Sequence, residues 1–351
     1  MQAAPIHLVS PPHIAIVRFS ALGDVALAAA AVRQLRRCLP DATLTWITSP
    51  LGYALLQGME GVQFEVYDKP ATLADYRAFY RAFSRRRFDV VLALQANLRI
   101  NLLYPALHAP IKIGFDRTRA REGQWLFCNR AIPFKNEHLL DSFLAFTHLL
   151  GCEPQVAEWA LPLSAEDTAW AQSAIRALPH PLLAIHPCAS KPERNWPLER
   201  LETVIRAAKS KWGCGFVFTG GNHPREREAC RRLASVAGDN ARDLCGLTTP
   251  KQLTALLGAV DGLIAPDTAA IHLARAMNTP VLGLYAVAPP ALSGPYQRGG
   301  YVVNRYPDAL RRVLGKDAAR VKWNARVHHP DAMRCIETDD VLQQLARLLA
   351  R

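Results

Sequence analysis

The stretch GLIAPDTAAIHLARAMNTPVLGLY, residues 262–285, constrains the fold more than any other part of this chain. A short apolar run stops at Pro266, and two good N-cap residues, Asp267 and Thr268, follow it. The next residues predict a helix that is apolar nearly all round and therefore buried. A second apolar run begins at Val281. This order of strand, helix and strand is typical of a βαβ unit in a parallel sheet.

The same stretch allows two interpretations of function. A helix that begins at the carboxyl end of a parallel strand points its free N–H groups and its positive dipole end toward the crevice where α/β folds bind ligands. A phosphate would suit that position. Alternatively, Asp267 only caps a buried helix, and on this stretch alone that interpretation is favoured. His272 lies four residues after Thr268, on the same helical face. It could be a histidine of the core, or it could donate a hydrogen bond to the phosphate.

Strands and helices alternate along both halves of the chain. Apolar runs predict strands at residues 14–19, 43–48, 62–66, 90–95 and 111–115, and again at 182–186, 216–219, 262–265 and 281–285. Residues 151–163 contain two prolines and no period, which indicates a linker, whereas residues 291–335 have no pattern that assigns them. We therefore expect an α/β protein with two Rossmann-like, doubly wound domains and a cleft between them.

Composition limits the partners and the compartment. The net charge of +12 implies an acidic partner, such as nucleic acid, an anionic membrane face, or a phosphorylated or carboxylated substrate. The eight cysteines form no C-x-x-C pair, so we expect reduced thiols in a cytosolic protein. The first residues lack the pattern of a signal peptide, and no apolar run is long enough for a membrane span. A peripheral membrane contact remains compatible with these features.

Charged residues near the expected strand ends are candidates for chemistry. Asp24 follows Gly23 at the start of a helix, where it is either a general base or a cap for a helix beginning at Val25. Arg194 and Lys191 are expected in a loop after a strand. They could bind a diphosphate, or they could be ordinary solvated residues of that loop.

Two acidic residues follow the Gly220-Gly221 turn. Either Glu226 or Glu228 could accept hydrogen bonds from a ribose, or could only stabilise the N-terminus of its helix. The sequence contains no G-x-G-x-x-G, no P-loop, no D-x-D after an apolar run and no H-E-x-x-H. A standard dinucleotide site, P-loop chemistry and a metal site are therefore not indicated.

Four segments together resemble glycosyltransferase family 9, the lipopolysaccharide heptosyltransferases. Residues 18–24 (RFSALGD) resemble the family's S-x-L-G-D motif, and residues 266–274 (PDTAAIHLA) resemble its D-T-G-x-x-H-L-A motif. Residues 194–197 (RNWP) are similar to its [KR]-x-W-P segment, and residues 114–123 are similar to the acceptor-side loop of heptosyltransferase I. The resemblance extends from about residue 14 to residue 290, with the motifs in the family's order.

The resemblance implies a GT-B fold and an inverting enzyme that needs neither a metal nor a cofactor. The implied reaction transfers L-glycero-D-manno-heptose from ADP-heptose to the Kdo of Kdo-lipid A in the inner core of lipopolysaccharide. It implies an acceptor-binding domain at residues 1–160, a nucleotide-sugar-binding domain at 161–335, and a C-terminal helix within 336–351 that docks on the first domain. The implied location is cytoplasmic and peripheral, at the anionic inner face of the inner membrane, without a nucleic-acid partner.

Residue roles follow from the matching positions. The resemblance implies that Asp24 is the catalytic base and that Arg194 neutralises the leaving ADP. The implied donor-binding residues are Ser190, Lys191, Glu226, Asp267, Thr268, Ala269 and His272, and the implied acceptor-binding residues are Arg117, Arg119 and Arg121.

The chain also departs from the family. Ala269 replaces the usual glycine, which narrows the approach of a phosphate to the backbone. The loop before Trp196 is one residue longer than in heptosyltransferase I, so Lys191 could replace Arg194; Glu226 and Glu228 also remain alternatives. A GT-B enzyme for another nucleotide sugar, whether a core transferase or an epimerase, and a non-catalytic module that binds anionic glycolipid or nucleic acid are the competing hypotheses. The sequence leaves open the donor sugar, first or second heptose addition, and the oligomeric state.

Overall fold

The computed structural model describes residues 6, 8, 11–296 and 300–350. The chain divides into two compact units, Met1–Pro162 and Leu163–Arg351. The division lies two residues after the boundary expected from the sequence. Within the described residues, no helix combines the length and the apolar character that crossing a bilayer requires.

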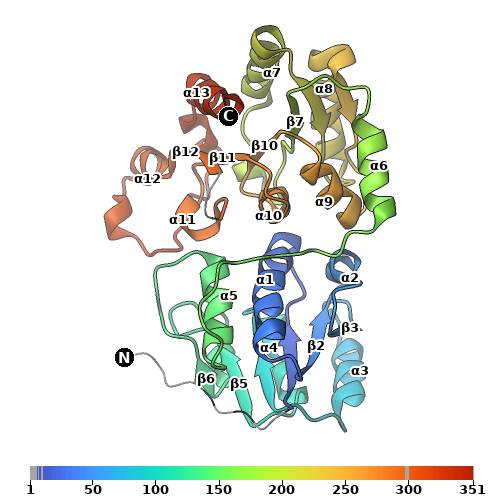
Figure 1. The fold of residues 1–351 in the computed structure, drawn as a ribbon. Helices are drawn as coiled ribbons and strands as arrows, with labels where there is room; N and C mark the ends of the chain where they lie inside the picture. The colour runs from blue at the N-terminus through green and yellow to red at the C-terminus, as the bar shows by residue number, and fades with distance from the viewer. Residues whose placement is uncertain (1–5, 7, 9–10, 297–299, 351) are drawn as a thin grey trace. The chain divides into compact units, whose positions relative to one another are not determined.

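The N-terminal unit is a parallel sheet with helices over it (Figure 1). The strand order is β3-β2-β1-β4-β5-β6. The strands are β1 (His13–Val17), β2 (Thr43–Thr48), β3 (Val62–Val66), β4 (Val90–Leu92), β5 (Ile111–Gly114) and β6 (Arg130–Ala131). The helices are α1 (Leu22–Cys38), α2 (Pro50–Leu56), α3 (Leu73–Phe83), α4 (Leu98–Asn101) and α5 (Leu139–His148), with the 3-10 turns η1 (Tyr104–Ala106) and η2 (Gln124–Leu126).

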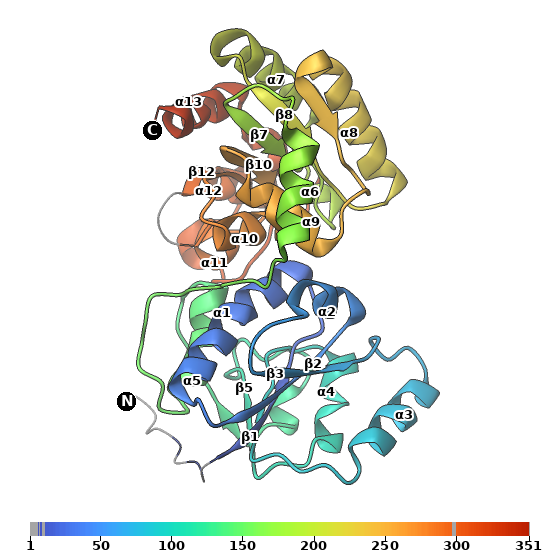
Figure 2. The same cartoon turned by 45° about the vertical axis from the view of Figure 1, so that its right-hand side comes forward.

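The C-terminal unit repeats this arrangement (Figure 2). Its strand order is β12-β11-β10-β7-β8-β9. The strands are β7 (Leu182–Ile185), β8 (Gly215–Phe218), β9 (Ala241–Asp243), β10 (Gly262–Pro266), β11 (Val281–Tyr285) and β12 (Gly300–Asn304). The helices are α6 (Ala165–Ile175), α7 (Leu198–Trp212), α8 (Pro224–Ala237), α9 (Pro250–Gly258), α10 (Ala269–Ala276), α11 (Pro290–Ser293), α12 (Tyr306–Leu314) and α13 (Thr338–Leu349).

Both sheets have the doubly wound order, in which the chain starts at the centre, moves to one edge, and returns to the centre to build the other side. The centre of the first sheet is the β1–β4 pair, and the centre of the second is the β7–β10 pair. The central strands are almost fully buried because helices cover parallel sheets on both faces. In such sheets, ligands bind at the carboxyl ends of the central strands.

The segment that the sequence left unassigned completes the second sheet. It contributes α11, β12 and α12, together with the 3-10 turns η5 (Ala318–Arg320) and η6 (Ala332–Cys335). The predicted C-terminal helix is present as α13, but its buried residues Val341, Leu345 and Leu348 belong to the core of the C-terminal unit. This apolar face packs against α7, β11 and β12 of its own unit.

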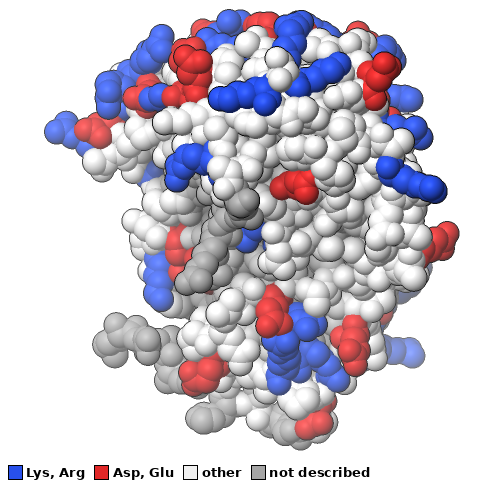
Figure 3. Space-filling view, turned by 45° about the horizontal axis from the view of Figure 1, so that its top comes forward, with Lys and Arg blue, Asp and Glu red and all other residues white. Residues whose placement is uncertain are grey.

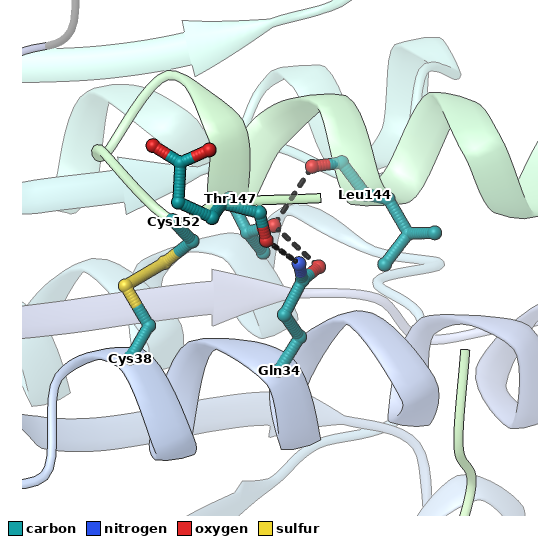
Figure 4. Close-up of a disulfide and its surroundings, with 6 residues drawn as sticks. Gln34, Cys38, Leu144, Thr147 and Cys152 are labelled. Carbon is teal, nitrogen blue, oxygen red and sulfur yellow. Dashed lines mark hydrogen bonds between the residues drawn. A yellow bond between two sulfur atoms is a disulfide. The ribbon is translucent and has the colours of Figure 1, made fainter. Parts of the chain in front are cut away.

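A disulfide joins Cys38, the last residue of α1, to Cys152, which follows α5 (Figure 4). Their Cα atoms lie 5.6 Å apart, and 114 residues separate them in sequence. Beside the disulfide, the Thr147 hydroxyl donates to the side-chain oxygen of Gln34 at 2.9 Å. The prediction that all cysteines are reduced is therefore wrong for this pair. Sequence spacing could not find it, because the packing of α1 on α5 brings the two residues together.

Candidate active site

Asp24 lies in the first turn of α1, directly after the central strand β1. The helix begins at Leu22, so Asp24 is its third residue and not the N-cap of a helix starting at Val25. One carboxylate oxygen accepts from the backbone N–H of Ala21 at 3.3 Å and forms an ion pair with the Arg18 guanidinium. The side chain is still 29% exposed. Asp24 therefore stabilises the helix start and also presents a carboxylate edge to solvent.

Arg18 holds this carboxylate from a buried position. Its other terminal nitrogen donates to the carbonyl oxygen of Leu94 at 2.5 Å, and its guanidinium lies 5.3 Å from the centre of the Phe143 ring. The side chain of Gln95, just beyond β4, accepts from the backbone N–H of Phe19 at 2.8 Å. The turn that carries Asp24 is thus fixed to the end of the neighbouring central strand. The sequence pattern did not single out Arg18 or Gln95 because these contacts span more than 70 residues.

The three arginines expected to hold the acceptor have different surroundings. Arg119 donates to Glu137 at 2.8 Å, to the Ser142 hydroxyl at 2.6 Å and to the Pro133 carbonyl at 2.6 Å. It also forms an ion pair with Asp116. These bonds tie the loop to α5, so Arg119 supports the structure of the loop. Arg117 and Arg121, by contrast, are exposed.

In the C-terminal unit, Arg194 and Asp267 meet at the carboxyl ends of the central strands β7 and β10. Arg194 ends the 3-10 turn η3 (Pro192–Arg194), and one of its terminal nitrogens lies 3.3 Å from a carboxylate oxygen of Asp267. The same nitrogen donates to the Asp267 carbonyl oxygen at 3.3 Å. The Ser293 hydroxyl donates to the other carboxylate oxygen at 3.2 Å. The Asp267 side chain is only 11% exposed, and its negative charge is balanced by the guanidinium of Arg194.

A second arginine, Arg326, reaches the same carboxylate. One of its terminal nitrogens lies 3.9 Å from the oxygen of Asp267 that faces Arg194. Its backbone is held because the N–H of the buried Val327 donates to the carbonyl of Val287 at 2.8 Å. Sequence reasoning missed Arg326, which lies in the unassigned region. No local pattern could have revealed it, since its position depends on that distant backbone pairing.

The helix α10 begins beside this cluster. Thr268 is its N-cap residue but makes no side-chain capping bond, and Ala269 is its first residue. Ala269 is not among the residues with a left-handed backbone, so the helix start does not need glycine there. His272 is buried one turn further along. The first turn of α10 thus directly follows Asp267, the residue that Arg194 and Arg326 reach.

The loop between β7 and α7 contains the remaining predicted donor residues. Ser190 and Lys191 are exposed, whereas Arg194 is half-buried against Asp267. At the start of this loop, burial lowers the pKa of His186 to about 4, and its Nδ1 lies 3.0 Å from the Thr219 hydroxyl. His186 is therefore a neutral side chain at pH 7. Of the two cations in the loop, Arg194 is the one that reaches the end of β10.

The two candidate acids on α8 also differ. Glu226 turns back toward the glycine turn after β8 and accepts from the Gly221 N–H at 2.6 Å. Glu228 is 68% exposed and pairs with Arg231 on the outer surface of the helix. Glu226 is thus the acid that lies at the carboxyl end of a strand. Among the described residues, no group of three or more His, Cys, Asp or Glu side chains could hold a metal ion.

Comparisons with known proteins identify one enzyme family. Residues 76–311 match the model of glycosyltransferase family 9 (heptosyltransferase). The chain is also similar to the lipopolysaccharide core heptosyltransferase OpsX of Haemophilus influenzae. The two sequences are 32% identical over 346 residues, which cover 98% of this chain and 99% of the relative.

Solved structures share the fold. A glycosyltransferase family 9 structure from Veillonella parvula has a TM-score of 0.78 at 20% identity, covering 97% of each chain. The E. coli heptosyltransferase WaaC, solved with ADP, has a TM-score of 0.72 at 20% identity, covering 96% of this chain and 99% of its own. These likenesses confirm the predicted GT-B fold.

Proposed function

Because the chain belongs to glycosyltransferase family 9, the heptosyltransferases, we propose that it transfers L-glycero-D-manno-heptose from ADP-heptose to the Kdo of Kdo-lipid A. The reaction would build the inner core of lipopolysaccharide, with inversion and without a metal. The name of the Haemophilus relative and the ADP bound to the E. coli enzyme support this choice. The observation that carries it is the placement of Arg194 and Arg326 around Asp267, at the first turn of α10.

In the proposed reaction, this cluster binds the diphosphate of the donor. Two guanidinium groups face one carboxylate, so the cluster keeps a net positive charge that suits an anion. When the bond between the anomeric carbon and ADP breaks, negative charge builds on the leaving oxygen. Arginine side chains and the first N–H groups of α10 stabilise that charge more in the transition state than in the ground state. Thr268, Ala269 and His272 form the wall of this site, and Lys191 and Ser190 line its exposed edge.

Asp24 serves as the general base. An acceptor hydroxyl attacks the anomeric carbon from the side opposite ADP, a new carbon–oxygen bond forms, and the hydroxyl proton passes to the Asp24 carboxylate. Arg18 orients that carboxylate, and its exposed edge leaves room for the incoming hydroxyl. Direct displacement of this kind inverts the anomeric configuration and requires no covalent intermediate. A positioned base contributes about 10²–10⁴-fold to such a step.

The remaining roles follow from charge and position. Glu226, beside the glycine turn after β8, accepts from the ribose hydroxyls. Arg117 and Arg121 are exposed and bind the carboxylate of Kdo, whereas Arg119 keeps their loop in shape. The N-terminal unit thus binds the acceptor, and the C-terminal unit binds the nucleotide sugar. The net charge of +12 suits a protein that works in the cytoplasm at the anionic inner face of the inner membrane, without a nucleic-acid partner.

The proposal is tested by supplying the purified protein with ADP-heptose and Kdo-lipid A, with and without a metal chelator. We expect release of ADP and a heptosylated product of inverted configuration, at the same rate in both conditions. Turnover with a different nucleotide sugar alone would identify another transferase or an epimerase. A flat calorimetric titration with ADP would reject both enzyme hypotheses and leave a glycolipid-binding module.

A further inference from the structure

Large apolar side chains are exposed on three adjoining elements of the N-terminal unit. Leu126 is 74% exposed and Trp125 is 44% exposed, both in η2. Six of the twelve exposed large hydrophobic residues in the described chain lie on α3, on η2, or on α4 and the residue after it. We call this set the α3–α4–η2 surface; it consists of Leu73, Tyr80, Leu98, Leu102, Trp125 and Leu126.

Hydrogen bonds hold the three elements together, with α4 in the middle. On one side, the Tyr80 hydroxyl of α3 donates to the carbonyl oxygen of Leu102 at 2.9 Å. On the other side, the side-chain nitrogen of Asn101 donates to the Arg121 carbonyl at 3.1 Å, and the N–H of Leu98 donates to the Glu122 carboxylate at 2.5 Å. The exposed apolar residues therefore belong to one continuous part of the unit.

Positive charge gathers in the same part of the chain. Residues 71–130 contain eleven Lys and Arg residues and four Asp and Glu residues, so this stretch carries +7 of the net +12. Two of the four acids have partners within a few residues: Asp75 accepts from the backbone N–H groups of Ala71 and Thr72, just before α3, and Asp116 pairs with Arg119. The exposed arginines on or beside the α3–α4–η2 surface are Arg77, Arg81, Arg99, Arg117 and Arg121.

The C-terminal unit distributes its charges differently. On α7 and α8, Glu202 pairs with Arg206 at 3.1 Å and with Arg232 at 2.6 Å. In the face drawn in Figure 3, Lys and Arg side chains lie among Asp and Glu side chains. Neighbouring charges of opposite sign cancel beyond about 10 Å at ordinary salt. The helices α7 and α8 together also carry a net charge of +4, from eight Lys and Arg residues and four Glu residues, but part of this charge is paired in such contacts. Neither helix has an exposed large apolar side chain, so of the two regions only the α3–α4–η2 surface combines exposed arginines with exposed apolar residues.

We propose that the α3–α4–η2 surface seats the protein on an anionic lipid bilayer. Trp and Tyr favour the interface between lipid and water, and leucines bury apolar area among the acyl chains. Arginines place their charge at the lipid phosphates while their stems stay in apolar surroundings. The loop of Arg117 and Arg121 leads into η2 beside this surface, so docking brings the proposed acceptor arginines to the height of the lipid head groups. In this respect the inference rests on the proposed function.

Bilayer binding is tested by sedimentation of the full chain with vesicles of phosphatidylcholine containing phosphatidylglycerol, and with vesicles of phosphatidylcholine alone. We expect binding to the anionic vesicles only, and weaker binding as salt rises. Each arginine near an anionic surface strengthens binding about fivefold, so R77Q with R81Q should weaken it about 25-fold. W125A with L126S should weaken it at least tenfold. The matched control removes an exposed leucine and an exposed arginine of the C-terminal unit, Leu247→Ser with Arg311→Gln, and should bind as the native chain does.

Two further measurements decide between this inference and its alternatives. The surface variants should transfer heptose to a soluble, deacylated acceptor at the native rate, and should be slow only with acceptor embedded in vesicles. Failure of the native chain to sediment with anionic vesicles, or equal sedimentation of all variants, would overturn the inference. A native dimer in light scattering that W125A with L126S converts to monomer would instead assign the surface to self-association. Loss of transfer to the soluble acceptor in the native chain would count against the proposed function, and not against the docking surface.

Discussion

The two units share one strand order but place their key carboxylates differently. In the N-terminal unit, Asp24 follows β1, the strand at which the unit starts; in the C-terminal unit, Asp267 follows β10, the strand at which the chain returns to the centre. Asp24 pairs with one guanidinium and is 29% exposed. Asp267 pairs with two guanidiniums and is 11% exposed.

A shared topology therefore fixes the location of a site but not its chemistry. Both carboxylates occupy the region where doubly wound folds bind ligands. A carboxylate with one cation and an open edge can accept a proton. A carboxylate enclosed by two cations organises them for an anionic ligand. The balance of charge around each aspartate therefore supports our proposal of a base in one unit and a diphosphate site in the other.

The largest expected effect tests the Asp24 side of this comparison. Asp24→Asn keeps the shape and the contact with Ala21 but removes the basic oxygen. We expect kcat to fall about 10²–10⁴-fold while ADP binding, measured by calorimetry, is unchanged. Asp41→Asn, at an exposed position in the same unit, is the matched control and should have native activity. Transfer by the Asp24 variant within a few-fold of the native rate would refute its role as base.

Arg194→Gln tests the Asp267 side of the comparison. It removes the guanidinium closest to Asp267, and we expect a loss of about 10²–10³-fold in kcat together with weaker ADP binding, because donors to a developing anion contribute on this scale. Lys191→Gln is the matched control, three residues away in the same loop but exposed. If the lysine variant were the more damaged of the two, the leaving group would be neutralised by Lys191 and the assignment would have to be reversed.

The residues that directly follow the first strand of each unit differ in charge. Arg18 follows β1 as a cation, whereas His186 follows β7 as a neutral ring whose pKa burial lowers to about 4. The unfolded chain, with a histidine pKa of about 6.5, binds this proton more readily than the folded chain. Stability from His186 is therefore fully present above pH 6.5 and falls as the pH drops from 6.5 toward 4, by about 3 kcal/mol in total.

The measurement is denaturant unfolding at several pH values, for the native chain and for His186→Gln. Glutamine can still bond to the Thr219 hydroxyl but does not titrate. We expect the loss of stability between pH 6.5 and 4 to be smaller in the variant by about 3 kcal/mol. Parallel curves for the two proteins would show that His186 titrates normally in the folded state.

The sequence predicted the features that depend on residues close together in the chain, namely the strands and the turns that follow them. Apolar runs identified most of the strands, and the turn after each run identified Asp24, Arg194 and Asp267 as candidates. Features created by long-range packing were missed. The Cys38–Cys152 disulfide needs α1 beside α5, and the contact of Arg18 needs β4 beside β1.

The C-terminal helix illustrates a further limit. Its amphipathic pattern correctly predicted a helix with one apolar face, but a pattern cannot identify the surface that the face covers. Gly262 in β10 leaves space that Leu348 of α13 fills: an added Cβ at Gly262 would lie 2.9 Å from the leucine side chain. That complementarity favours the packing of α13 within the C-terminal unit.

Arg326→Gln tests whether the second guanidinium belongs to the diphosphate site. Arg326 lies 3.9 Å from the Asp267 carboxylate, further than Arg194 at 3.3 Å. We therefore expect a smaller loss than for Arg194, on the order of tenfold in kcat/KM. Arg320→Gln, an exposed arginine of the same segment, provides the control and should leave the rate unchanged. Equal rates for Arg326→Gln and Arg320→Gln would mean that only one cation near Asp267, Arg194, contributes to catalysis. The site would then resemble that of Asp24, which pairs with one guanidinium.

The smallest effect is expected from Ala269→Gly, which restores the glycine of the family motif at the start of α10. The backbone at Ala269 is not left-handed, so glycine relieves no strain there. Glycine costs a helix about 0.5–1 kcal/mol relative to alanine, and less at its first residue, where the N–H has no partner within the helix. Calorimetry with ADP should therefore show an affinity within about threefold of native, with slightly lower stability. An affinity gain of tenfold or more would mean that the alanine methyl group limits the approach of the diphosphate. The arginines around Asp267 would then compensate for a backbone contact that the native chain lacks.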